Sequence, residues 1–386
     1  MPEPSAGVSA AGRASASRRG WLGLAAGAVC APVAGLGTSL GLGGTPAAVR
    51  AAPAATGRAL PVEGAGATFP SRVWQVWAER YAAATGQTVS YRPTGSGDGL
   101  QRISARQVDF AGSDTPLSRA DLERRRLQQW PMLIGGIAPV AHLPELGGRA
   151  LRVDGPTLAR LMLGEIRRWD DAALQALNPG LALPPRAVAR VVRADRSGTT
   201  EALSRYLAAA LPAFAAGPGV GALPAWGADV QAVAGNDGQL EAMRARPGTL
   251  GYVSHDRLPE APELTALMLR NRAGQWRPLD EAGLRQAVLA SAMHREGQDT
   301  ASLLDLPGED VWPLTLASHV LVDARPAQRQ RASATLSFLY WCLQRGDAVP
   351  RRLGFAPLPV VVQARLAERF MAIVAADGQR PDYVRE

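Results

Sequence analysis

From residue 61 onward, apolar and polar positions follow two spacings along the chain. Between residues 70 and 84, Val73, Trp77 and Tyr81 recur every four positions, which predicts an amphipathic helix. Short runs rich in β-branched residues alternate with such helical stretches, and glycine-rich turns connect them. This alternation predicts an α/β architecture with mainly parallel strands. We expect helices at 70–84, 99–106, 157–163, 170–177 and 199–210, and strands at 89–92, 108–111 and 189–193.

Residues 1–52 have the pattern of an export signal followed by a linker. Arg18 and Arg19 form a twin-arginine pair directly before an uncharged stretch, 21–49, that is dominated by Ala, Gly and Leu. Glycines dilute this stretch and two prolines interrupt it, which favours a cleaved signal over a membrane-spanning helix. We therefore expect a periplasmic protein, with an uncleaved membrane tether as the alternative.

The amino-acid composition of the chain excludes several classes of function. The 386 residues are 47% hydrophobic, enough apolar material for two buried cores. All 42 basic residues are Arg, which excludes a Schiff-base lysine and a P-loop lysine. The net charge of +8 is spread out, without a basic block interleaved with aromatics, so we expect no nucleic-acid partner. The four histidines lack ligand spacing and Cys342 lies in an apolar run, so we expect no metal site and a buried thiol.

Candidate chemistry gathers in four short segments at the ends of predicted strands. Two glycine-rich turns, 64–69 and 94–99, each lead from an extended segment into a helix. A third strand runs through Ser113 into Asp114, so a carboxylate stands where that strand ends. The fourth segment, 193–199, carries a strand into a helix through an arginine, hydroxyl groups and a glycine.

These segments together suggest an anion site. A helix start presents unpaired N–H groups and partial positive charge, so several converging starts would hold an anion. Hydroxyls of Thr68, Ser96, Ser197 and Thr199 would add donors, and the planar fork of Arg193 suits two oxygens of a tetrahedral oxyanion. Each turn taken alone also has a purely conformational explanation, because glycine-rich turns before helices are common in α/β proteins.

The motifs resemble, in order, those of the phosphate-binding proteins (PstS) of phosphate-specific ABC transporters. The resemblance runs from about residue 61 to about 345, through the segments 64–70, 95–99, 109–118, 134–136, 163–170, 178–180, 193–199, 235–238, 251–253 and 309–313. It implies a two-lobed, periplasmic-binding-protein-like α/β fold of type II, with a ligand cleft between lobes that close by hinge motion. The first lobe would comprise 61–142 plus 313–386, and the second 143–312.

The same resemblance implies a function. The protein would capture inorganic phosphate in the periplasm and deliver it to a membrane ABC permease, as a monomer without catalytic activity or cofactor. The implied phosphate contacts are Thr68, Phe69, Ser96, Asp114, Arg193, Ser197, Gly198 and Thr199. Two alternatives stay open: a phosphatase-like enzyme on this fold, and a receptor for another oxyanion or a phosphorylated solute.

Two carboxylates would shape the selectivity of such a site. A carboxylate repels an oxyanion unless a proton lies between them, so Asp114 would tolerate phosphate, which keeps a proton near neutral pH, and penalise sulfate. The alternative is that Asp114 only caps the next helix or balances Arg193. Asp195, two residues after Arg193, is expected to orient the guanidinium.

Two positions depart from the family pattern beside the expected ligand. Asp98 stands where small residues are usual, and Arg196 replaces a small residue. Asp98 is either an outward-facing helix N-cap or a second carboxylate that weakens phosphate binding, in which case Arg196 would offset it.

Overall fold

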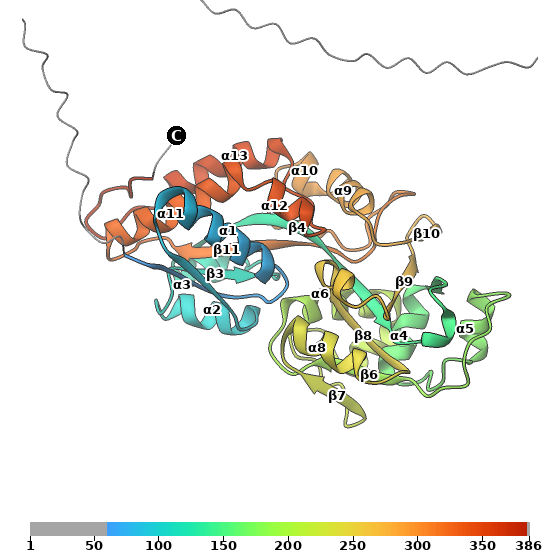
Figure 1. The fold of residues 1–386 in the computed structure, drawn as a ribbon. Helices are drawn as coiled ribbons and strands as arrows, with labels where there is room; N and C mark the ends of the chain where they lie inside the picture. Colours follow the sequence, from blue (N-terminus) through green and yellow to red (C-terminus); the bar gives the residue numbers. More distant parts are fainter. Residues whose placement is uncertain (1–59, 384–386) are drawn as a thin grey trace, which may run out of the picture. The chain divides into compact units, whose positions relative to one another are not determined.

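One long strand, β4 (Leu127–Ala141), connects the two lobes of the protein (Figure 1). The structure is a computed structural model that describes residues 60–383 of the chain. Within these residues, two groups of helices and strands are each built around their own sheet, and β4 belongs to both sheets. The two-lobed α/β fold is therefore confirmed. The export signal expected at residues 1–52 lies outside the described residues.

The sheet of the first lobe has the strand order β2-β1-β3-β11-β4. Strand β1 pairs in parallel with β2 and β3, whereas β11 runs antiparallel to both β3 and β4. The carboxyl ends of β1, β2 and β3 consequently meet at one edge of this sheet. The bounds are β1 Val62–Gly66, β2 Val89–Pro93, β3 Phe110–Ser113 and β11 Thr315–Asp323.

The sheet of the second lobe continues from the other half of β4. Its strand order is β4-β8-β6-β7, with β6 parallel to both β7 and β8. A smaller group pairs through β9, which contacts β4, β5 and β10. The bounds are β5 Leu151–Val153, β6 Ala189–Arg193, β7 Val230–Val233, β8 Thr249–Ser254, β9 Thr265–Arg270 and β10 Trp276–Arg277.

Helices flank both sheets (Figure 1). Those of the first lobe are α1 Ser71–Thr85, α2 Ser96–Ser104, α3 Arg119–Arg125, α11 Arg329–Arg345, α12 Ala348–Arg352 and α13 Val360–Met371. Those of the second are η1 Pro144–Leu146, α4 Gly155–Leu163, α5 Ala172–Leu177, α6 Gly198–Ala210, α7 Pro212–Ala216, α8 Gly235–Arg244 and η2 His255–Glu260. Two more helices, α9 Glu281–Ala290 and α10 Ala292–Arg295, pack against β4 and α13. The predicted lobe boundaries stay a prediction.

The change of partner along β4 marks the hinge between the lobes. Residues from Leu127 to Gly136 pair with β11, and residues from Ile137 to Ala141 pair with β8. Because the strand itself is continuous, the backbone between Gly136 and Ile137 passes directly from one sheet to the other.

An aromatic cluster fixes the first sheet against its helices. The Trp74 ring, in α1, lies 5.1 Å from the ring centroid of Phe110 and 5.6 Å from that of Tyr91. The four-residue spacing in α1 places Trp77 and Tyr81 in the same core, as predicted for 70–84. The last residue of β1, Gly66, has φ of 130°, and a Cβ there would lie 2.2 Å from the carbonyl oxygen of Gly112. Only glycine fits between these strands.

The predicted elements are confirmed with shifts at their ends. Strand β6 has the predicted bounds, and the helix predicted at 99–106 begins three residues earlier, at Ser96. The glycine-rich turn supplies its first helical turn, since the Gly99 N–H donates to the Gly95 carbonyl at 3.0 Å. The strand predicted at 108–111 is displaced toward Ser113. The expectation of mainly parallel strands is wrong for β4 and β11, whose long-range pairing is antiparallel.

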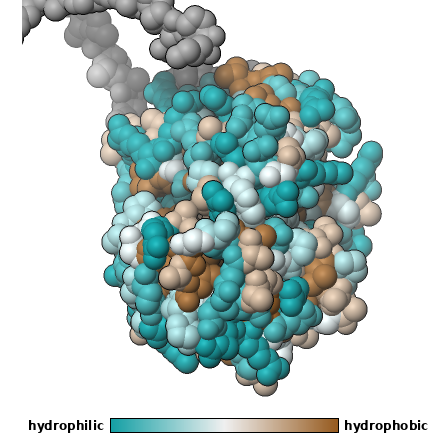
Figure 2. Space-filling model, turned by 90° about the vertical axis from the view of Figure 1, so that its right-hand side faces the viewer, coloured by the Kyte–Doolittle hydropathy of each residue, from teal (hydrophilic) through white to brown (hydrophobic). Residues whose placement is uncertain are grey.

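The surface of the described residues is largely polar. Figure 2 shows one face on which hydrophilic residues predominate and hydrophobic residues form small separate groups. No helix within residues 60–383 has the length and apolar character needed to cross a membrane. Cys342 is buried in α11, as expected from the apolar run around it.

Candidate functional site

Four strand ends bring the predicted site residues toward one place between the lobes. Strands β1, β2 and β3 end at the same edge of the first sheet, and each is followed by one of the predicted segments. The carbonyl of Gly66 accepts the N–H groups of Thr94 and Gly95, at 2.9 and 2.8 Å, and so ties the first turn to the second. The fourth segment comes from β6 in the other lobe, and its Arg196 carbonyl accepts the Gly97 N–H at 3.0 Å.

Ser96 lies where the starts of α2 and α6 meet. Its hydroxyl oxygen is 3.3 Å from the backbone nitrogen of Asp114 and 3.3 Å from that of Gly198. A Cβ on Gly198 would lie 2.7 Å from the Ser96 hydroxyl oxygen and 2.8 Å from the Asp114 Cβ. A glycine at the start of α6 is therefore what lets the second lobe approach Ser96 and Asp114 this closely.

The start of α6 presents two further hydroxyl groups to this region. Ser197 is the N-cap of the helix, and its side chain accepts the Thr200 N–H at 3.1 Å. The Thr199 hydroxyl donates to Oδ2 of Asp114 at 3.3 Å. Both side chains are buried, so the structure brings Ser197, Gly198 and Thr199 together with Ser96 and Asp114.

Asp114 is a buried carboxyl group surrounded by hydroxyl donors. Its Oδ1 accepts the hydroxyl of Ser318 at 2.8 Å, and its Oδ2 accepts that of Thr199. Burial raises the pKa of Asp114 to about 6, although Ser318, the charge of Arg193 and Thr199 act in the opposite direction. Such a group can change between proton acceptor and donor close to neutral pH. The alternative of Asp114 as the cap of the next helix is wrong, because Ser118 holds that position.

Arg193 carries a guanidinium that is only partly satisfied by the protein. Its Nε donates to Oδ1 of Asp195 at 2.7 Å, and its Nη2 donates to Oδ2 of the same carboxylate. The third nitrogen, Nη1, is buried and has no hydrogen-bond partner among residues 60–383. A buried guanidinium nitrogen without a partner is costly, so this atom is available for an anion.

Asp195 holds the Arg193 side chain in place, as expected. Its Oδ1 also accepts the Gly235 N–H at 3.0 Å, at the start of α8. Burial acts to raise the pKa of Asp195, but the hydrogen bonds and charge of Arg193 outweigh it and lower this pKa below its ordinary value. The carboxylate stays ionised and leaves one edge of the guanidinium for other partners.

Thr68 and Phe69 approach the same region from the first lobe. The Thr68 hydroxyl oxygen accepts the side-chain amide of Asn236 at 3.0 Å, and a Cβ on Gly235 would lie 3.7 Å from the Thr68 methyl. The Phe69 ring is fully buried against Phe355, at a centroid distance of 5.3 Å. The first turn is thus next to the Gly235 backbone that binds Asp195.

The structure shows different surroundings for Asp98 and Arg196, the two residues that depart from the family pattern. Asp98 lies in the first turn of α2 and accepts Arg102 Nε at 2.6 Å; the N-cap position belongs to Gly95, so the N-cap expectation is wrong. Partial burial acts to raise the pKa of Asp98, but hydrogen bonding and the charge of Arg102 lower it. The exposed Arg196 packs over Gly97, where a Cβ would lie 2.5 Å from the Arg196 Cβ. The charge of Asp98 is therefore offset by Arg102.

Two residues that contact this site were missed by sequence reasoning. Ser318 binds the Asp114 carboxylate from 204 positions away in the chain, and Asn236 binds Thr68 from 168 positions away. Ser318 carried no distinct signal, because β11 also contains the polar residues Thr315, His319 and Asp323. Asn236 lies in the glycine-containing segment 235–238, whose chemistry the sequence alone left unassigned.

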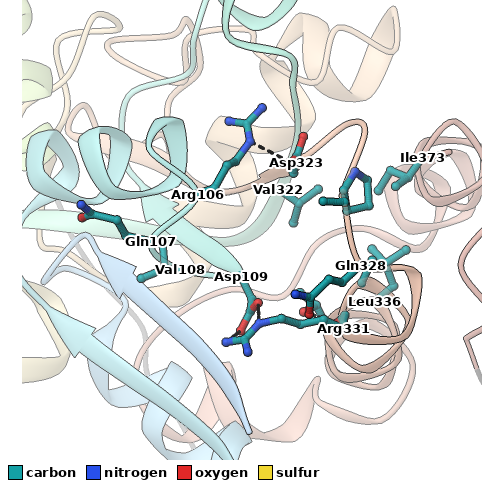
Figure 3. Close-up of a pocket in the computed structure, with 14 residues that line it drawn as sticks. Arg106, Gln107, Val108, Asp109, Val322, Asp323, Gln328, Arg331, Leu336 and Ile373 are labelled. Carbon is teal, nitrogen blue, oxygen red and sulfur yellow. Dashed lines mark hydrogen bonds and ion pairs between the residues drawn. The ribbon is translucent and has the colours of Figure 1, made fainter. Parts of the chain in front are cut away.

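A separate surface pocket of about 320 Å³ lies at the opposite ends of β3 and β11 (Figure 3). Its charged groups are matched within the protein: Arg106 Nε lies 2.7 Å from Asp323 Oδ2, and Arg331 Nη2 donates to Asp109 at 2.9 Å. Because each guanidinium there faces a carboxylate, this pocket lacks the unpaired positive charge found at Arg193. Residues 60–383 contain no group of three or more His, Cys, Asp or Glu side chains able to hold a metal.

The raised pKa of Asp114 predicts how the stability of the ligand-free protein depends on pH. The folded state keeps this proton to higher pH than the unfolded state does, so the contribution of Asp114 to the free energy of unfolding should fall as pH rises from about 4 to about 7. Asp114→Asn removes the buried charge and should be more stable than the parent by about 3 kcal/mol above pH 7, with no gain below pH 4. Urea unfolding at several pH values measures this difference, and parallel curves for the two proteins would contradict it.

The chain is similar over most of its length to known phosphate-binding proteins. A family model described as a PBP superfamily domain matches residues 48–345. The phosphate-binding protein PstS of Haemophilus influenzae is 33% identical over 318 residues, which cover 81% of this chain and 93% of that protein. PstS of Pasteurella multocida is 33% identical over 328 residues, covering 84% and 94%.

Solved structures show the same fold. A periplasmic phosphate-binding protein, PfluDING, bound with phosphate, has a TM-score of 0.63 at 22% identity and covers 81% of this chain and 94% of its own. A phosphate-binding protein from Stenotrophomonas maltophilia has a TM-score of 0.62 at 20% identity, with the same coverage. At these identities, the structural similarity supports the fold.

Proposed function

The chain belongs to the PBP superfamily and, within it, to the PstS phosphate-binding proteins, and from this premise we propose that it captures inorganic phosphate between its lobes and delivers it to an ABC permease. The observation that carries this proposal is the buried Nη1 of Arg193, which has no hydrogen-bond partner within residues 60–383 and lies near the buried Asp114. One group offers an unmet positive donor and the other a proton acceptor. Hydrogen phosphate supplies both complements in one small ion.

The proposed phosphate contacts are the donors that surround these two groups. They are Thr68, Phe69, Ser96, Arg193, Ser197, Gly198 and Thr199, with Asp114 as the acceptor of the phosphate proton. The start of α6 favours this role, since its Gly198 N–H points toward the Ser96 hydroxyl, which also contacts the backbone nitrogen of Asp114. The lobes are proposed as 61–142 plus 313–386 and 143–312, joined by β4.

We further propose a non-catalytic role in the periplasm. The named relatives are phosphate-binding proteins, and the twin-arginine pattern in residues 1–52 fits export. A phosphatase would need a nucleophile or an activated water beside the bound phosphate. The hydroxyls nearest to Asp114 are already hydrogen-bonded to it, and Asp114 itself is better suited to holding a proton on the ligand than to activating water.

Calorimetric titration of the mature chain tests the proposal. We expect one phosphate site per chain at pH 7.5. Sulfate should bind at least roughly 100-fold more weakly, because the Asp114 carboxylate repels it. A phosphomonoester should also bind at least roughly 100-fold more weakly, because the closed cleft between the lobes would leave no room for its ester group. A hydrolysis assay with the same monoester should show no turnover. Equal binding of phosphate and sulfate would contradict the selectivity, and sustained hydrolysis would favour an enzyme.

A further inference from the structure

A buried ionic cluster lies beside the turn that contains Thr68 and Phe69. Its centre is Arg257, in η2 just after β8, whose side chain is 1% exposed. Arg257 Nε donates to Asp237 Oδ1 at 2.8 Å, and Nη1 donates to the equally buried Asp256. Nη2 donates to the Ser71 hydroxyl at 2.9 Å and to the Thr68 carbonyl at 3.3 Å. All three nitrogens of this guanidinium are therefore used.

Neighbouring residues of the second lobe hold the same turn. The Asn236 amide donates to the Thr68 hydroxyl oxygen at 3.0 Å and its Oδ1 accepts the Ser254 N–H at 2.9 Å. The Ser254 hydroxyl lies 3.4 Å from the Phe69 carbonyl and also binds Asp256. The cluster is next to the hinge, because Ser254 pairs with Ile137, where β4 enters the second sheet.

The contact between Arg257 and the Thr68 carbonyl affects the direction of the Phe69 N–H, which is a proposed donor to phosphate. In a trans peptide, the carbonyl of Thr68 and the N–H of Phe69 lie in one plane and point in opposite directions. When the Thr68 carbonyl points toward Arg257, the Phe69 N–H therefore points away from Arg257. A cationic donor on the carbonyl also polarises the peptide, which strengthens its N–H as a donor.

Resting on the proposed function, we propose that Arg257 is a positioning residue for phosphate binding, which fixes the Thr68–Phe69 peptide so that the Phe69 N–H is held toward the ligand. Asp256 and Asp237 balance its charge and hold the guanidinium in place. Arg72 approaches the same carboxylates, with its Nε 3.8 Å from Asp256 and its Nη2 3.6 Å from Asp237. Phosphate capture then depends on a group that does not itself touch phosphate.

The chain offers a matched control for a purely structural role. Arg190, in β6, is another buried arginine that donates to a backbone carbonyl, that of Met162 at 2.8 Å, and pairs with Asp229. Replacing either arginine by Met removes a buried guanidinium and its ion pair. Of these two arginines, only Arg257 contacts a carbonyl in the turn of Thr68 and Phe69, and the same Thr68 carbonyl also accepts the Ser71 hydroxyl at 2.9 Å.

The test compares phosphate affinity with the NMR signal of the Phe69 amide in the mature chain. We expect Arg257→Met to weaken phosphate binding roughly tenfold and to move the Phe69 amide proton upfield in both the free and the phosphate-bound protein. Arg257→Lys keeps the positive charge, so its phosphate affinity and its Phe69 amide signal should lie between those of the parent and those of Arg257→Met. Arg190→Met should lower the melting temperature while leaving phosphate affinity and the Phe69 signal unchanged.

A double variant shows whether the loss of phosphate affinity in Arg257→Met arises only from misfolding around an unpaired carboxylate. Arg257→Met combined with Asp256→Asn leaves no unpaired buried carboxylate at that position and should show the same loss of affinity and the same upfield shift. The proposal is overturned if these variants bind phosphate as tightly as the parent, or if affinity falls without a change at Phe69. Failure of the parent to bind phosphate would instead refute the proposed function, while the Phe69 signal of the free proteins still tests the role of Arg257.

Discussion

Asp114→Asn is expected to lower the ratio of phosphate affinity to sulfate affinity by roughly 100-fold, mainly through a gain in sulfate binding. The carboxylate of Asp114 is buried, and its hydroxyl partners Ser318 and Thr199 already occupy part of its acceptor capacity. Sulfate has no proton to place between its oxygen and this carboxylate, so the two negative charges repel at short range. An asparagine amide removes that charge and offers an N–H to a sulfate oxygen, whereas phosphate exchanges a charged proton acceptor for a weaker, neutral amide oxygen.

Titration of both anions at pH 7.5 measures the ratio. The parent protein provides an internal check, because its sulfate affinity should rise as pH falls through about 6, where Asp114 gains a proton, while Asp114→Asn should show no such rise. Asp98→Asn is the matched control, since that carboxylate pairs with Arg102 and its loss should leave the ratio unchanged. An unaltered ratio in Asp114→Asn would refute the role of this carboxyl group in selectivity.

Arg193→Lys is expected to weaken phosphate binding by roughly 100-fold or more, although the positive charge is kept. The guanidinium binds Asp195 through Nε and Nη2, while Nη1 has no hydrogen-bond partner in the part of the chain that the structure describes. A lysine ammonium is a single point of charge and cannot hold the same carboxylate along two bonds while presenting a third donor in a fixed direction.

Asp195→Asn separates geometry from charge in this pair. It retains the guanidinium and one hydrogen-bonding oxygen, so we expect a smaller loss of phosphate affinity than in Arg193→Lys. Calorimetry at equal ionic strength compares the two variants, and melting curves without phosphate show whether either is unfolded. Phosphate binding by Arg193→Lys within a few-fold of the parent would show that Nη1 is not a ligand donor.

Local patterns were sufficient to predict the elements that carry the site. The start of α6 after Ser197 follows from a short sequence signal, because a cap and its helix lie within three residues of each other. The turns at Thr68 and Ser96 likewise follow from glycines next to strand ends. What makes these turns a site is their convergence, which came from the resemblance to PstS and not from spacing.

Contacts between distant segments escaped prediction for a physical reason. Ser318, Asn236 and Arg257 act on Asp114, Thr68 and the Thr68 carbonyl across 204, 168 and 189 positions, and nothing in their immediate neighbours encodes those partners. The antiparallel pairing of β11 with β4 has the same origin, since alternation within a strand does not specify which strand lies beside it. No local signal marked Ser318, because polar residues occur elsewhere in the same strand, including the adjacent His319.

The burial of Cys342 makes the protein suited to carry an optical reporter. Its thiol lies within α11, and burial raises its pKa well above the ordinary value, so little thiolate is present at neutral pH. After removal of residues 1–52, which contain Cys30, a cysteine introduced at the exposed Leu223 would then be the reactive thiol for a maleimide dye, in a chain without lysine side chains to compete. Binding of an ion would then change the fluorescence of such a conjugate.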